Sequence, residues 1–207
     1  PIARLAHPAH IEPVDLDKDG RLDFLVAELG SFQPADHDNG AVYWLRQRPD
    51  GSYVTVPIAT KLARTADARA ADFDGDGDLD VIVGGFGWRT TGNVTLLENR
   101  TKDWKTPQFV PRVLDPRTGA IHVPTIDLNK DGKPDVLTAN ASTNKVSLLI
   151  GDGQGNFMLS ATAPTVGTTP SYMAAGDLDL DGNMDVVVAN TNNSAKSFTV
   201  LKGDGMG

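Results

Sequence analysis

Short apolar runs recur along the chain and alternate with polar, glycine-rich turns. Each run holds three or four apolar or β-branched residues, which is too short for a helix and typical of a strand buried on both faces. The runs lie at residues 24–27, 81–84, 136–139 and 186–189. A second strand-like stretch follows each run after a turn, at residues 41–45, 93–97, 145–149 and 198–201. The pattern contains no amphipathic helical stretch of useful length and predicts an all-β protein.

Each apolar run follows the same nine-residue acidic segment, which occurs four times. The segments begin at Asp15, Asp72, Asp127 and Asp177, so their starts lie 57, 55 and 50 residues apart. Third strands are expected at residues 53–56, 109–113 and 157–160, and a strand before each acidic segment completes four per unit. This period suits the four-stranded antiparallel blade of a β-propeller. We predict a single domain over residues 1–207, with repeats at approximately 6–63, 64–118, 119–168 and 169–207.

Both ends of the sequence fall inside repeat units. Residues 1–14 align without gaps on residues 58–71, so residues 1–5 are expected to end a strand of a preceding blade. Residues 203–207 match residues 151–155, so the last blade is expected to be incomplete. The first residue is not Met and no signal-peptide pattern follows, which indicates a processed or trimmed end. The sequence favours four blades of a larger ring over a closed ring of four.

The acidic segment carries the residue types that calcium prefers. Ca²⁺ takes about six to eight oxygen ligands, and side chains at positions 1, 3 and 5 of a tight loop converge on one point. Glycine at position 6 permits the sharp turn, position 7 offers its carbonyl oxygen, and position 9 is always aspartate. The expected ligands of up to four Ca²⁺ ions are Asp15, Asp17, Asp19, Arg21 and Asp23; Asp72, Asp74, Asp76, Asp78 and Asp80; Asp127, Asn129, Asp131, Lys133 and Asp135; and Asp177, Asp179, Asp181, Asn183 and Asp185.

The charge of the chain is consistent with bound cations. The formal net charge is −8, and fifteen of the 27 acidic residues are predicted ligands. Carboxylates packed this closely repel one another unless a cation lies between them, and four Ca²⁺ ions would bring the formal charge near zero. The third loop has Asn129 in place of an aspartate and is expected to be the weakest site. The negative charge also argues against a nucleic-acid partner, and the apolar runs are too short to span a membrane.

Two other interpretations of the acidic segment fit less well. An EF-hand needs a glutamate at position 12 and flanking helices, whereas position 12 here is valine or threonine and a strand follows. A single Asp-Gly pair often marks nothing more than a hairpin turn. Four copies in the same register favour the calcium interpretation.

The segment Asp-x-Asp/Asn-x-Asp-Gly-x-x-Asp followed by an apolar strand resembles the FG-GAP/VCBS repeat family. This family supplies the calcium-bearing blades of integrin α-subunit propellers and of some fungal and bacterial lectin-like propellers. The resemblance covers essentially the whole chain, and residues 84–87 stand where the family's GAP segment falls. It implies a propeller with calcium in the loop joining the first two strands of each blade, in a secreted or cell-surface protein. Family rings commonly have seven blades, whereas four repeats are present here.

No catalytic constellation accompanies the repeats. The chain has no cysteine and no Gly-x-Ser-x-Gly nucleophile elbow, so we expect a protein that is not an enzyme and in which calcium is structural. The function expected is a binding or adhesion module for a carbohydrate or protein ligand. Two alternatives remain open: a structural subunit that self-associates through its incomplete blades, and a non-catalytic part of a larger secreted enzyme.

The candidate ligand site lies in loops after the second strand of a unit, on the face opposite the calcium loops. Phe32 and His37 belong to the first such loop, and Trp88 and Arg89 belong to the second. Exposed aromatic rings beside polar groups suit sugar rings or peptide side chains. The alternative is that these aromatic residues fill the seams between blades. His7 and His10 are expected to be solvated loop residues, with a small metal site formed by the two as the alternative.

Overall fold

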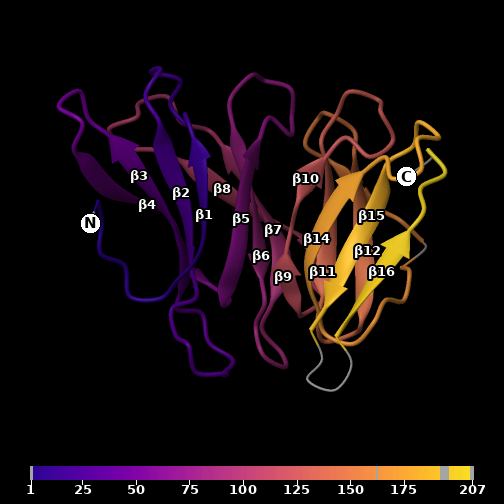
Figure 1. Ribbon diagram of the computed structural model, residues 1–207. Helices are drawn as coiled ribbons and strands as arrows, with labels where there is room; N and C mark the ends of the chain where they lie inside the picture. The colour runs from indigo at the N-terminus through magenta and orange to yellow at the C-terminus, as the bar shows by residue number, and fades with distance from the viewer. Residues whose placement is uncertain (1, 162, 192–195, 206–207) are drawn as a thin grey trace.

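The computed structural model describes residues 2–161, 163–191 and 196–205, and every regular element in these ranges is a β-strand. The strands form four antiparallel sheets that lie side by side in chain order (Figure 1). The prediction of an all-β fold built of four antiparallel units is therefore confirmed. Among the described residues no helix is long and apolar enough to cross a bilayer.

Three of the sheets are meanders in which strands consecutive in sequence pair with one another, and the third follows the same order apart from its first strand. The first sheet contains β1 (Pro8–Val14), β2 (Asp23–Glu28), β3 (Gly40–Gln47) and β4 (Tyr53–Leu62). The second contains β5 (Thr65–Ala71), β6 (Asp80–Gly85), β7 (Asn93–Asn99) and β8 (Phe109–Asp115). The third contains β9 (Ala120–His122), β10 (Thr125–Ile126), β11 (Asp135–Asn140), β12 (Lys145–Gly151) and β13 (Phe157–Leu159). The fourth contains β14 (Pro170–Gly176), β15 (Asp185–Asn190) and β16 (Ser197–Leu201).

The first strand of the third sheet departs from the expected four-strand pattern. It is split into β9 and β10, which both pair with β11. Val123 donates its backbone N–H to the Asp67 carboxylate of the second sheet at 2.9 Å, and Pro124 has no N–H to donate. The ladder is interrupted at these two residues. The fourth sheet has three strands in the described part of the chain, with β16 as its last.

The core lies between neighbouring sheets. Along β6, Val81 and Val83 pack toward the first sheet, whereas Ile82 packs toward the third. Side chains alternate between the two faces of a strand, so a strand covered on both sides needs mainly apolar side chains on both faces. This arrangement explains the continuous apolar runs of the sequence. A third cluster joins the third and fourth sheets and includes Val146 and Val188.

Residues 2–5 belong to no strand. Ile2, Ala3 and Leu5 line a hollow beside Val26 and Leu45 of the first sheet. They therefore lie against the face of the first sheet that the second sheet leaves free.

The two ends of the sheets carry different loops. The acidic segments join the first and second strands of every sheet and lie together at the upper end in Figure 1. The connections from β2 to β3 and from β6 to β7 lie at the opposite end. The fold therefore separates the predicted metal loops from the predicted ligand loops.

Candidate metal centre

The four acidic loops share one backbone conformation. Position 4 has a φ between 55° and 75° in Lys18, Gly75, Lys130 and Leu180. Position 6 has a φ between 83° and 91° in Gly20, Gly77, Gly132 and Gly182. A Cβ added to any of these position-6 glycines would meet no atom within 4 Å. Glycine is therefore required at position 6 for its left-handed conformation and not for lack of space.

The carboxylates at positions 1 and 5 shape each loop by accepting backbone hydrogen bonds. The position-1 aspartate accepts the N–H of the position-6 glycine at 2.9–3.0 Å in all four loops. The position-5 aspartate accepts the N–H of position 7 at 2.7–3.0 Å in each loop. These bonds wind the loop around its own acidic side chains. The repeated sequence therefore gives a repeated geometry.

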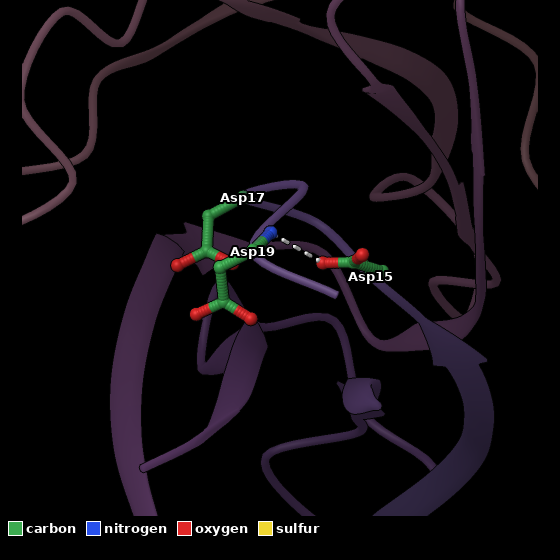
Figure 2. A group of neighbouring side chains, drawn as sticks. All are labelled: Asp15, Asp17 and Asp19. Atoms are coloured by element: carbon green, nitrogen blue, oxygen red, sulfur yellow. Dashed lines mark hydrogen bonds between the residues drawn. The ribbon is translucent and has the colours of Figure 1, made fainter. Parts of the chain in front are cut away.

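Three loops bring three carboxylates close enough to hold one metal ion. In each group, one ligand atom from each residue lies within 4.8 Å of the others, and the groups are Asp15, Asp17 and Asp19; Asp72, Asp74 and Asp80; and Asp177, Asp179 and Asp185. Figure 2 shows the carboxylates of Asp17 and Asp19 beside each other, and the hydrogen bond from the Asp19 N–H to Asp15. These side chains fit a hard divalent cation.

The other predicted aspartates fall outside these groups. They are Asp23, Asp76, Asp127, Asp131, Asp135 and Asp181. The third loop contributes none of its aspartates to a group of three acids, and at position 3 it has Asn129 where the other loops have their second aspartate. Its expected weakness as a calcium site stays a prediction.

The aspartate at position 9 has a second role that the sequence did not reveal. Asp80 is buried and accepts the N–H of Phe73 at 3.1 Å and the N–H of Asn99 at 2.7 Å. It thereby ties the acidic loop to the end of β7. Equivalent bonds to the loop and to the end of the next strand are made by Asp135 and Asp185. Asp23 bonds to Gln47 at the end of β3 and to the indole of Trp44.

Burial makes these carboxylates costly to ionise without a cation. Removal from water raises the pKa of Asp80 to about 6, and the nearby Asp74 and Asp76 carboxylates add to the effect. Burial also raises the pKa of Asp17, Asp23, Asp74 and Asp135. A divalent cation among such groups stabilises their charged form. Asp17 Oδ1 and Asp177 Oδ1 are buried and accept no hydrogen bond, so they are open to a metal.

The loops differ in how far basic side chains neutralise the ligands. Arg46 Nη2 lies 2.6 Å from Asp17 Oδ2, and Arg21 pairs with Asp19. Lys133 lies 3.5 Å from Asp131, and Lys202 pairs with Asp179. In the second loop, all of which the structure describes, no ligand carboxylate has such a partner; Lys18 pairs with the Asp78 side chain, whose predicted role uses only the carbonyl oxygen. The second loop therefore holds the largest uncompensated negative charge.

The predicted ligand loops meet at the opposite end of the sheets. Asp36 Oδ1 accepts hydrogen bonds from four consecutive backbone N–H groups, those of residues 88–91, at 2.9–3.2 Å. Phe32 is 64% exposed and Trp88 is 42% exposed, so neither ring fills a seam. Arg89 is exposed, and the half-buried His37 accepts the Asn39 N–H. The structure thus brings the four candidate residues onto two joined loops.

A second polar cluster lies on the first strands of the sheets. His10, Asp67, His122 and Tyr172 each stand five residues before the first aspartate of an acidic segment, directly after a β-bulge or register shift. His10 was expected in a solvated loop, but it lies half-buried in β1 with Nε2 3.5 Å from Asp67 Oδ1. Aligning the repeats on their acidic segments would have revealed this set, although its residue types differ from repeat to repeat.

Comparison with known protein families identifies one family to which the chain belongs. Residues 15–83 and 127–188 match the family model of the FG-GAP-like repeat, which together is more than half of the sequence. The protein therefore belongs to the FG-GAP-like repeat family, as the acidic segments indicated. No curated protein sequence matches the chain.

Proposed function

We propose that the chain supplies four calcium-binding blades of a β-propeller that acts outside the cell as a binding or adhesion module without catalytic activity of its own. The observation that carries this proposal is the acidic loop, which has the same conformation in four copies and gathers three carboxylates in three of them. Membership of the FG-GAP-like repeat family supports it, because repeats of this family are typical of extracellular proteins.

Calcium would act in this module as a structural ion. It would join the carboxylates of positions 1, 3, 5 and 9 with the carbonyl oxygen of position 7, and so fix the hairpin between the first two strands of a blade. A ligand that binds only the folded state stabilises it by about 2.7 kcal/mol when its concentration is 100 times its dissociation constant. Several sites of this kind would make folding depend on calcium.

Calcium titration of the metal-free protein by calorimetry, with ion counting by native mass spectrometry, tests the proposal. The protein is expected to bind up to four ions, and Asp74→Asn is expected to remove or weaken one of them. Asp78→Asn is the matched control, because it makes the same charge change four residues along the same loop. It keeps the carbonyl oxygen of residue 78, which is the predicted ligand there. Binding of no ion, or equal losses in the two variants, would contradict the proposal.

The joined loops are the surface that we propose for a carbohydrate or protein ligand. Phe32 and Trp88 present exposed rings there, beside His37 and Arg89. An array of glycans probed in calcium, with Trp88→Ala in parallel, tests the carbohydrate form of this idea. Binding that the variant loses supports it, and an array without any signal in calcium removes it.

An assembly role is the second candidate, because the outer face of the fourth sheet is apolar and uncovered. Tyr172 and Phe198 both pair with Ala189, from the strands on either side of it. Their side chains therefore lie on one face of the sheet, together with that of Val200, which pairs with Val187. Phe198 is 78% exposed, and Tyr172 and Val200 are more than half exposed. Light scattering after gel filtration tests this role: a dimer that Phe198→Asp converts to a monomer supports it, and a wild-type monomer at high concentration excludes it.

A further inference from the structure

Arg64 is a buried cation without an acidic partner. The residue is 6% exposed, and no carboxylate of the described chain lies within ion-pair distance of it. Among the described residues its guanidinium reaches two backbone oxygens, of Gly87 and Phe32, both at a long distance of 3.5 Å, and its Nε has no partner. A buried charge with no counter-charge is costly. The fold therefore holds a guanidinium that is ready for an anion.

A cavity of about 440 Å³ lies beside Arg64. It opens among the first strands of the sheets, near the ends opposite the acidic loops, where the four equivalent positions of the polar cluster meet. Its polar and aromatic lining includes Arg64, Phe86, His10, Asp67, His122 and Tyr172. A cavity of this size accommodates a monosaccharide or a single peptide side chain.

The other charges that face the cavity are already balanced. Asp67 accepts bonds from the Ala68 and Val123 N–H groups and pairs with Arg69 Nε at 3.1 Å. The same arginine pairs with Glu12 at 3.3 Å. Burial lowers the pKa of His10, and it lowers that of His122 to about 4, so both imidazoles are neutral near pH 7. Among the described residues that line the cavity, Arg64 is thus the charged side chain without a counter-charge.

We propose that this cavity binds a carboxylate group, with the Arg64 guanidinium as its anchor. Phe86 holds the guanidinium from one side, since its ring centroid lies 5.5 Å from Cζ. The three guanidinium nitrogens make only two long hydrogen bonds to the described residues, so the guanidinium keeps donors for the two parallel bonds that it makes to a carboxylate. The exposed ring of Tyr172 offers an apolar wall for the body of the ligand.

A carboxylate fits better than a phosphate dianion. One arginine balances one negative charge, and a second charge would face Asp67, which also lines the cavity. The inference rests on the binding-module function proposed above and names the chemistry of its ligand. The carboxylate can come from a sugar acid or from an acidic side chain of a protein, and the two sources call for separate probes.

Titration of the calcium-loaded protein with two matched pairs of probes tests the inference. Glucuronate is compared with glucose, and N-acetyl-aspartate methylamide is compared with its asparagine analogue. The acidic member of at least one pair is expected to bind about tenfold to a hundredfold more tightly, as for bonds to a charged group. It is also expected to shift the NMR signal of the Arg64 Nε–H. Equal binding within both pairs, or a binding probe that leaves this signal unmoved, would overturn the inference.

Substitutions then separate charge from geometry. Arg64→Lys keeps the charge but lacks the planar fork, and is expected to lose most of the preference for the acidic probe; Arg64→Gln is expected to lose all of it. Arg48→Gln removes an exposed arginine and is the matched control. If Arg64→Gln does not fold, Arg64→Lys and the wild-type NMR titration still decide. The number of bound calcium ions is measured on the same samples. Calcium binding without a preference for the acidic probe would contradict this inference alone, whereas a preference for the acidic probe without calcium binding would contradict the calcium proposal alone.

Discussion

The aspartate at position 9 holds two elements together, and in the second and fourth loops it also belongs to the group of carboxylates that could hold an ion. Asp80 bonds the loop backbone and the end of β7 at the same time, and it does so while buried. A carboxylate oxygen has a lone pair left after it accepts one hydrogen bond, so the same aspartate can hold the loop and the strand together and also bind a metal ion. Loss of this residue would open the hairpin even without any change in metal binding. Substitutions at position 3 are therefore cleaner tests of the ion.

The third loop allows a gain of function. Asn129→Asp gives this loop the same four carboxylates as the others, and more ligand charge raises calcium affinity. We expect calcium affinity at this site to rise several-fold, while the stability of the metal-free variant falls because a further carboxylate is repelled. Calorimetric titration and melting in a chelator measure the two effects.

Gln33→Glu is the control for this gain, because it adds the same charge in an exposed loop at the other end of the sheets. A variant that gains no affinity, or a control that gains as much, would show that position 3 of the loop is not a ligand.

His122 gives the folded protein a dependence on pH that is separate from the acidic loops. Its ring faces Asp67, Arg69 and His10, stacks on Tyr172, and accepts the Met173 N–H. Burial lowers its pKa from 6.5 to about 4, so between these values the unfolded chain binds more protons than the folded one. Stability is therefore lost as the pH falls through this window, by at most about 1.4 kcal/mol per pH unit.

His122→Gln removes this contribution, so the gap in unfolding free energy between wild type and variant should shrink from pH 7 to pH 4.5. Urea unfolding in saturating calcium at several pH values measures it. His37→Gln, in the loop at residues 29–39 and outside this cluster, is the control. A gap that stays constant over this range would contradict the assignment.

Single residues were predictable from the sequence only where a motif repeats. The acidic ligands stand in four copies, and the structure gathers nine of them into three groups. The cluster of His10, Asp67, His122 and Tyr172 was missed because each repeat contributes a different residue type to it. The unpaired state of Arg64 was also invisible, since it depends on which acids fail to approach it in three dimensions.

At the scale of elements, one carboxylate joins two loops that belong to different sheets. Asp36 Oδ1 accepts hydrogen bonds from the consecutive backbone N–H groups of residues 88–91, as a bound anion would. These hydrogen bonds hold the pKa of Asp36 well below its usual range. Consecutive N–H groups that point at one oxygen form a ready anion site. The two predicted ligand loops are therefore joined through the ionised Asp36 carboxylate.

Asp36→Ala is expected to free both loops without unfolding the sheets. Amide hydrogen exchange should quicken at residues 88–91 while the buried strands β2 and β6 keep their protection, because exchange reports local opening. Asp38→Ala, two residues along the same exposed loop, is the control. Equal protection of residues 88–91 in both variants would show that the hydrogen bonds to Asp36 do not hold the two loops together.

The elements themselves were predictable to a large extent. The apolar runs mark β2, β6, β11 and β15. In β6 and β11, which have a sheet on either side, every residue is buried, so the alternation of polar and apolar residues typical of a half-covered strand is absent. The split of the third sheet's first strand was not predictable in the same way. It depends on Pro124 and on a bond from Val123 to Asp67, which lies 56 residues away. Local patterns carry no information about such a partner.

At the scale of the whole molecule, the acidic loops concentrate negative charge at one end of the sheets. The chain has a formal charge of −8, and most of its acidic residues are predicted ligands. Without calcium these carboxylates repel one another across a short distance, and only some have a basic partner, such as Arg46 or Lys202. The stability of the metal-free protein should therefore depend on anything that weakens this repulsion.

Removal of calcium with EDTA is expected to lower the melting temperature by roughly 5–10 °C for each site that was occupied at 100 times its dissociation constant. Sodium chloride near 1 M, where the Debye length is about 3 Å, should restore part of this loss in EDTA and change little in calcium. Magnesium at the same concentration should restore less than calcium, because it demands a small octahedral shell that a loop built for more ligands does not provide.

Thermal melts under these five conditions distinguish specific binding of an ion in the loops from simple screening of the repulsion. If salt and calcium raised the melting temperature equally, screening would account for both effects and the loops would need no bound ion. If EDTA left the melting temperature unchanged, the repulsion would already be balanced by the ion pairs of the protein. A calcium effect that exceeds those of salt and magnesium is the result expected from the geometry of the loops, since only an ion of suitable size and coordination number can join several carboxylates within 4.8 Å of one another.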